Sequence, residues 1–282
     1  MFETRLAGVA LLALAVACSS SNSAGPAADS GVVADAAPPG NDWSCIGHVT
    51  LSPPAKTTLM WKLWPSDMIG NDMFANLPVQ VCGATDVKCA SPVAMGTTDA
   101  TTGYATLSVP AGQNGFDGFW QSQPTGAHTT LNFSNIPIRN DVQIDQRQEW
   151  DANAIRNALG PAGVQWDTTK AIVLFRVQDC NSGYLHQDTV PTVPQSTAAL
   201  GTGVSVTIAP SASGIVTGYF QDGMLATTAT QTDASGQGGF VDVPQGSVTL
   251  TAKVVATGQT IGTAHVYARA GSVTDTVLAP SP

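Results

Sequence analysis

Strict alternation of apolar and polar residues in short segments is the feature that most constrains the fold. The clearest case is GSVTLTAKVV at 246–255, where Val248, Leu250, Ala252 and Val254 alternate with polar residues. A period of two is typical of an antiparallel strand with one buried face. The pattern therefore predicts a mainly β protein.

Further segments rich in β-branched and aromatic residues recur along the chain, separated by clusters of Gly, Pro, Ser and Asp. They predict strands at 47–51, 57–63, 77–82, 104–109, 115–121, 129–134, 171–177, 203–208, 263–269 and 272–278. This spacing is typical of antiparallel sandwiches and barrels.

One segment, QEWDANAIRNALGPAG at 148–163, has a helical period instead. Its apolar residues lie three to four positions apart, and Gly160–Pro161 supplies a stop signal. We expect one short helix, whose apolar stripe packs against the body of the protein: Trp150, Ala154, Ile155, Ala158 and Leu159.

A fifteen-residue phrase occurs twice, as TDATTGYATLSVPAG at 98–112 and TDASGQGGFVDVPQG at 232–246. Asp99 and Asp233 can each close a turn by accepting backbone N–H bonds two residues on. The glycines that follow, Gly103 in one copy and Gly236 with Gly238 in the other, can take a positive φ. A strand and then Val-Pro-x-Gly complete each copy, so the phrase predicts turn–strand–turn and a duplicated domain rather than a solenoid.

The second copy, with the strand GVSV at 203–206 before it, resembles the signature of carboxypeptidase-regulatory-like domains, which are transthyretin-like β-sandwiches. LPVQV at 77–81 precedes the first copy in a similar way, although QNGFDGFWQSQ then departs from the family pattern. The resemblance implies two antiparallel Ig-like or transthyretin-like sandwiches without a catalytic motif. We expect them at 45–139 and 168–282, joined by a helical connector at 140–167.

The N-terminus, MFETRLAGVALLALAVACSSS, combines one Arg, a short apolar run and small residues, which is typical of a secretory signal. Its end, LAVAC, resembles the lipobox of bacterial lipoproteins, in which Cys18 would carry the acyl chains (palmitate among them) after removal of the signal. Ser19 after the cysteine implies the outer membrane. The alternative is an ordinary cleaved signal with a chance cysteine.

Residues 19–44 are small, polar and free of Lys and Arg, so they are expected to form a disordered tether between the membrane and the folded part. Charged residues make up only 11% of the chain, and the net charge is −9. Nucleic-acid binding needs clustered positive charge, so this class of partner is excluded. The expected partners are the membrane, through the lipid anchor, and a carbohydrate or another envelope protein.

Four cysteines follow Cys18, and an export signal places them in an oxidising compartment. Cys82 and Cys89 bracket a short turn and are the preferred disulfide. Cys45 and Cys180 are the two cysteines that remain, and only for this reason are they the possible second disulfide. Free thiols at these two positions are nearly as plausible. The spacing does not fit a tetrahedral zinc site.

No metal or cofactor is predicted. The four histidines are far apart in sequence and match no metal motif: His48, His128, His186 and His265. Four oxygen-bearing side chains could ligate calcium, but they lack the spacing of an EF-hand and are better explained as turn residues: Asp67, Asn71, Asp72 and Asn76.

Aromatic residues of the first half give the main functional indication. If exposed along one edge, they could stack on sugar rings or anchor a protein; otherwise they fill the core: Trp61, Trp64, Phe116, Phe119 and Trp120. The sequence thus predicts a non-catalytic cell-envelope lipoprotein with a structural or binding role. The alternative is a secreted hydrolase with an active site assembled at the domain seam.

Overall fold

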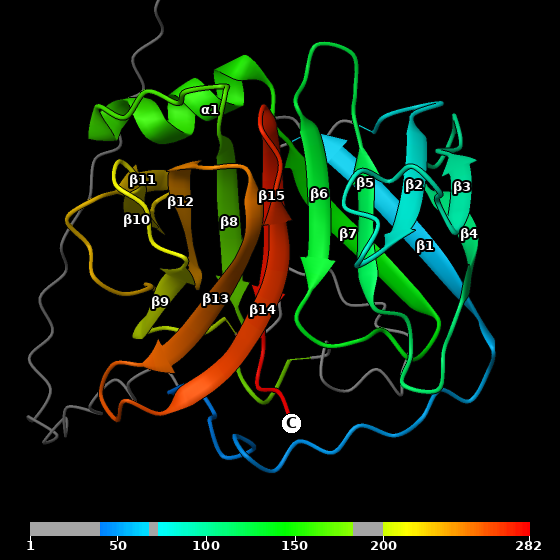
Figure 1. Cartoon of the computed structure of the whole chain (residues 1–282), viewed down its shortest axis with the longest axis horizontal. Coiled ribbons are helices and arrows are strands. Elements are labelled where there is room, and N and C mark those ends of the chain that lie inside the picture. The colour runs from blue at the N-terminus through cyan, green and yellow to red at the C-terminus, as the bar shows by residue number, and fades with distance from the viewer. Residues whose placement is uncertain (1–39, 68–72, 183–199) are drawn as a thin grey trace, which may run out of the picture. The chain divides into compact units, whose positions relative to one another are not determined.

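The computed structural model describes residues 40–67, 73–182 and 200–282 (Figure 1). In this part of the chain the structure is mainly β. The strands are β1 (Thr58–Asp67), β2 (Pro78–Gly83), β3 (Ala94–Thr97), β4 (Ala105–Pro110), β5 (Gly118–Ser122), β6 (Thr129–Ser134), β7 (Val142–Glu149), β8 (Ala171–Val177), β9 (Val204–Ala209), β10 (Val216–Gln221), β11 (Met224–Ala226), β12 (Gln237–Val243), β13 (Gly246–Val254), β14 (Thr260–Ala268) and β15 (Ser272–Leu278). Helix α1 (Ala152–Leu159) and the 3-10 helix η1 (Gly160–Ala162) follow β7.

The strands form three sheets. One has nine strands in the order β11-β10-β12-β8-β15-β6-β5-β2-β3, and two have three strands each, β4-β1-β7 and β14-β13-β9. Most neighbouring strands are antiparallel, but β1–β7, β8–β15 and β6–β15 are parallel.

The two halves of the chain share much of one topology, although the third strand of each pairs differently, β3 with β2 in the first half and β10 with β12 in the second. In the first half, β4-β1-β7 faces β6-β5-β2-β3, and in the second half β12-β8-β15 faces β14-β13-β9 in the same sequence order. Each half also contains the same unusual feature, a parallel pair between its first and last strands. The duplicated phrase in the sequence therefore corresponds to a duplicated arrangement of strands.

The halves are joined within one sheet. Strand β15 of the second half pairs in parallel with β6 of the first half, from Ser272↔Thr129 to Val277↔Ser134. In Figure 1, β6, β5, β2 and β3 accordingly continue the sheet beyond β15. The sequence prediction of separate sandwiches did not include this shared sheet.

Three clusters of buried residues cover the two faces of the nine-stranded sheet. On one face, Val173 and Phe175 of β8 join Phe119 of β5 in a core shared with β13 and β14. On the opposite face, Trp120 of β5 packs with strands β1 and β4, while Leu174 of β8 packs with helix α1. The sheet is therefore the middle layer, covered by β14-β13-β9 on one side and by β4-β1-β7 and α1 on the other.

A buried threonine fixes the start of both copies of the phrase. The Thr98 Oγ1 atom accepts a hydrogen bond from the Leu77 N–H at 2.9 Å and donates to the Phe74 carbonyl. In the second copy, Thr232 Oγ1 accepts from the Val204 N–H at 3.0 Å and donates to the Gly201 carbonyl at 2.6 Å. The hydroxyl thus satisfies the same two backbone groups in each half.

The predicted turns after these threonines are confirmed. The Asp99 carboxylate accepts from the backbone N–H groups of residues 101 and 102, and that of Asp233 accepts from residue 235. Gly103 and Gly236 have φ values of 70° and 64°. Gly238 does not share this role: it lies in β12, and a Cβ atom there would lie 2.4 Å from the Phe175 ring.

Several expected boundaries differ from the structure. Residues 47–51 form no strand, and the helix begins at Ala152 because Asp151 caps it. Strand β7 lies in the range assigned to the connector, because its pairing with β1 is long-range and leaves no local signal. Residues 40–44, expected to belong to the tether, are held by the second half of the chain.

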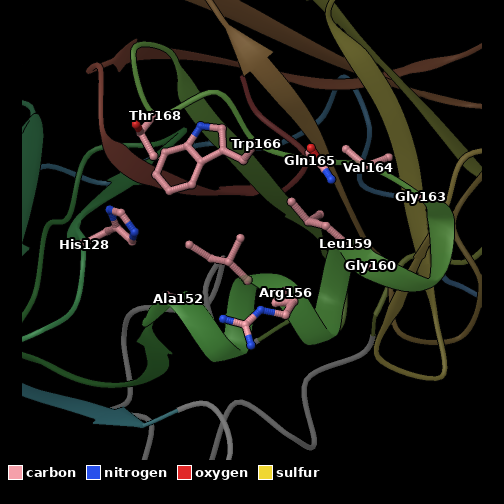
Figure 2. A pocket seen from close by; sticks show the side chains of 11 residues that line it. His128, Ala152, Arg156, Leu159, Gly160, Gly163, Val164, Gln165, Trp166 and Thr168 are labelled. Carbon is pink, nitrogen blue, oxygen red and sulfur yellow. The ribbon is translucent and has the colours of Figure 1, made fainter.

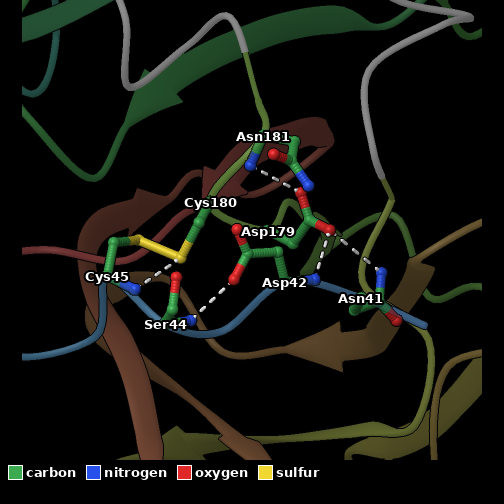
Figure 3. The surroundings of a disulfide bond; sticks show 7 residues. All are labelled: Asn41, Asp42, Ser44, Cys45, Asp179, Cys180 and Asn181. Carbon is green, nitrogen blue, oxygen red and sulfur yellow. Dashed lines mark hydrogen bonds between the residues drawn. A yellow bond between two sulfur atoms is a disulfide. The ribbon is translucent and has the colours of Figure 1, made fainter. Parts of the chain in front are cut away.

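Both disulfides are present, Cys82–Cys89 and Cys45–Cys180, with Cα atoms 5.4 and 5.8 Å apart. Figure 3 shows how the second one fastens residues 41–45 beyond the end of β8. The Asp179 carboxylate accepts the Asp42 N–H at 2.9 Å, and the Cys180 N–H donates to the Asp42 carbonyl at 2.9 Å. The segment that precedes the first half is therefore bound to the second half.

Candidate ligand site

Helix α1 forms one wall of the candidate site and is defined by its cap and its apolar stripe. The Asp151 carboxylate accepts from the N–H groups of Asn153 and Ala154 at 2.8 and 2.6 Å, which satisfies donors that a helix start leaves free. The predicted stripe is confirmed as a packing face, because Ala154, Ile155, Ala158 and Leu159 are buried with Trp150 against β8, β10 and β12.

A cavity of about 450 Å³ lies between α1, the segment that follows it and the turn before β6. This volume falls within the range of small-molecule sites, roughly 300–1,000 Å³. Helix α1 and the following turn supply Ala152, Ile155, Arg156, Leu159 and Gly160, and the remaining lining residues are His128, Gly163, Val164, Gln165, Trp166 and Thr168. In Figure 2, Trp166 and Thr168 lie across the cavity from Ala152 and Arg156, with His128 at one side.

The wall opposite the helix is held by contacts on both sides of Trp166. The His128 and Trp166 rings meet edge to face with centroids 4.6 Å apart, and His128 Nδ1 lies 3.1 Å from the Gly271 carbonyl oxygen. The next residue, Asp167, donates its backbone N–H to the Asp242 carboxylate at 2.8 Å. The aromatic wall is therefore positioned before any ligand binds.

Among the described residues that line the cavity, the charge is positive. Arg156 is exposed at the rim, and its guanidinium makes no ion pair or hydrogen bond within the described part of the chain. No Asp or Glu is among the lining residues. Two carboxylates that flank the lining segments are engaged elsewhere, Asp151 with the helix N-terminus and Asp167 with Thr169 and Lys170. The hydrogen bonds from Thr169 hold the pKa of Asp167 below its usual value.

Four of the five aromatics predicted as possible binding residues are buried in the interior. Trp61, Phe116, Phe119 and Trp120 are each at most 7% exposed, so their rings are not available at a surface. Trp64 is half-buried and stacks on Tyr104 with centroids 5.9 Å apart. Their burial corresponds to the alternative stated from sequence, in which these residues fill the core.

The other candidate residues are not brought together. His48 and His265 are exposed, and His186 lies outside the described residues, as does Cys18. His265 Nδ1 lies 3.0 Å from Thr249 Oγ1, and His128 Nδ1 lies beside the Gly271 carbonyl oxygen, so the described hydrogen bonds of these two histidines involve no Ser or Cys side chain. Asn71 and Asp72 also lie outside the described residues, and no group of three potential metal ligands occurs among the residues that are described.

Sequence reasoning missed the cavity because its walls come from three separate places in the chain. The one local signal was Trp166, an aromatic residue directly after the predicted helix stop and before the strand at 171–177. Nothing in the sequence placed His128 beside it.

Comparisons with known proteins place the chain in no family. No family model matches it, and no curated protein sequence matches it. Among solved structures, it is similar to the shaft pilin SpaA of Lactobacillus rhamnosus GG (14% identity, 82% of this chain and 99% of the pilin, TM-score 0.23). It is also similar to the minor pilin GBS52 of Streptococcus agalactiae (14% identity, 79% and 98%, TM-score 0.23).

The Bacillus anthracis TIE protein is a further similar structure, with 13% identity, coverage of 80% of this chain and a TM-score of 0.25. The chain spans about a third of that protein, 34% of its length. At these identities and scores we draw no conclusion about function. The resemblance to carboxypeptidase-regulatory-like domains stays a prediction. None of the helices within the described ranges is long and apolar enough to cross a bilayer.

Proposed function

We propose that this chain is a non-catalytic, lipid-anchored protein of the cell envelope that binds a ligand in the cavity beside α1. The observation that carries the binding role is the cavity itself: an apolar floor of Ile155 and Leu159, an aromatic wall, and Arg156, which has no partner among the described residues. Small-molecule sites typically combine a mostly apolar lining with a few polar groups in this way.

The envelope location is supported by the export signal and by the disulfides. All four cysteines that follow Cys18 are paired, which fits an oxidising compartment. The lipobox and the tether extend the proposal to an acylated Cys18 and an outer-membrane anchor. Replacing Cys18 with Ser should move the protein from the membrane fraction to the soluble fraction, and continued membrane association would contradict the anchor.

The binding role is tested by photo-crosslinking in the native envelope. A benzoylphenylalanine at Gln165, which is exposed and lines the cavity, should capture a ligand that mass spectrometry can identify. The matched control carries the same photoreactive residue at Gln259, which is exposed in the turn between β13 and β14. Equal capture at both positions, or no capture at Gln165, would contradict the proposal that the ligand binds in this cavity.

No observation favours the hydrolase alternative. The cavity lining contains a histidine, but it contains neither a Ser or Cys nucleophile nor a carboxylate to orient that histidine.

A further inference from the structure

We infer that the ligand of the cavity beside α1 is a saccharide that carries a carboxylate. This inference rests on the proposed binding function and adds the chemical class of the ligand. It combines two observations that are independent of each other, the shape and chemistry of the aromatic wall and the charge at the rim.

The aromatic wall fits a ring with an apolar face. Trp166 is half-buried, its ring lines the cavity, and its edge contact with His128 holds its orientation. A large, flat and rigid aromatic surface provides contact area at a low cost in conformational entropy. Across the cavity, the exposed Ala152 on α1 leaves space in front of this surface.

The polar groups around this wall fit hydroxyls. Gln165 and Thr168 lie on either side of Trp166 in sequence and line the same cavity. Their amide and hydroxyl groups both donate and accept hydrogen bonds, as sugar hydroxyls do. A purely apolar ligand would make no use of these groups.

The positive charge at the rim of the cavity is the basis for a carboxylate on the saccharide. Arg156 is the cation of the lining, and its five N–H donors have no partner in the described part of the chain. A guanidinium matches the planar geometry of a carboxylate and can bind it through two parallel hydrogen bonds. A neutral sugar would leave the Arg156 guanidinium without a charged partner in the cavity.

The test uses the full chain solubilised in detergent, with calorimetric titration of trigalacturonate and of the neutral galactose trisaccharide of the same linkage. The acidic trisaccharide should bind at least tenfold more tightly than the neutral one. Trp166→Ala should abolish binding of the acidic trisaccharide. Arg156→Gln should weaken its binding about tenfold and leave that of the neutral trisaccharide unchanged.

Arg156→Gln keeps the experiment interpretable if Trp166→Ala fails to fold, because residue 156 is exposed and Gln is a good helix former. The matched control is Lys253→Gln, which removes one positive charge at an exposed position of β13 and should leave both affinities unchanged.

Equal binding of the two trisaccharides, or no effect of Arg156→Gln, would overturn the inference that the ligand carries a carboxylate. The proposed binding function would be unaffected. Absence of saccharide binding, together with capture of a different ligand at position 165, would overturn the inference alone. If neither saccharide binding nor capture of a ligand at position 165 is observed, the proposed function is overturned as well.

Discussion

Replacing Asp275 with Asn is expected to stabilise the protein at neutral and alkaline pH and to leave its stability unchanged near pH 4. Asp275 lies in β15 and is 3% exposed. Its register partners are Asn132 of β6 and Leu174 of β8, so it lies where the two halves of the nine-stranded sheet meet. Burial raises the pKa of Asp275 from 3.8 to about 7, although nearby Arg176 acts in the opposite direction.

The magnitude follows from linkage between protonation and folding. Between pH 3.8 and about 7 the folded protein holds a proton that the unfolded chain has released, so stability falls as pH rises through this window. At about 1.4 kcal/mol for each pH unit, the loss is about 4 kcal/mol once pH exceeds 7. Asn cannot ionise, so the variant avoids this loss. The Asn132 Oδ1 atom, which has no hydrogen-bond partner among the described residues, can accept from a protonated Asp275 or from the new amide.

The assay is urea unfolding of parent and Asp275→Asn at several pH values from about 4 to 8. Subtracting the two free energies of unfolding cancels every other titrating group, so the difference isolates Asp275. It should grow from near zero at about pH 4 to about 4 kcal/mol at about pH 8. Asp117→Asn makes the same change at an exposed position as a control. Parallel curves for parent and Asp275→Asn would refute the reasoning.

Five further substitutions, grouped in three comparisons, test the packing of the fold by urea unfolding. Cys45→Ser opens a loop closed over a 135-residue separation and should cost about 5 kcal/mol, whereas Cys82→Ser, with a separation of 7, should cost about 2.5 kcal/mol; equal losses would contradict the chain-entropy account. Thr98→Val and Thr232→Val should each cost about 1–3 kcal/mol because a buried N–H loses its acceptor, and a loss at only one position would argue against equivalence of the two copies. Ile155→Ala should cost about 2–5 kcal/mol, and a negligible loss would show that α1 does not pack on the sheet as described.

The parts of the fold that sequence predicted are those encoded locally. Alternation at 246–255 corresponds to β13, in which Val248, Leu250, Ala252 and Val254 are all buried. The turns at Asp99 and Asp233 depend only on residues two or three positions away, and for this reason they could be read directly.

The missed parts depend on partners far away in the chain. Strand β7 is rich in polar residues, and its strand character depends on pairing with β1 about eighty residues earlier. The parallel contact of β6 with β15 leaves no mark in either segment. Thr98 and Thr232 resemble ordinary surface turn residues in sequence, and their burial depends on the arrangement of each half.

The candidate site was missed for the same reason. Sequence reasoning searched among the aromatics of the first half, whereas the structure buries four of these five and places Trp166 beside a cavity. A run of aromatics indicates a core at least as often as a surface, and burial distinguishes the two.

The Cys45–Cys180 bond has a mechanical consequence for a chain held at its N-terminus. Tension applied at residue 40 and at the C-terminus passes from Cys45 to Cys180 through the disulfide and enters the protein beyond the end of β8. The strands of the first half, β1 to β7, then lie outside the load path. Over the separation of 135 residues, at about 3.3–3.6 Å per extended residue, the bond withholds roughly 450–490 Å of chain from stretching. Reduction of this bond would place the first half in series with the load.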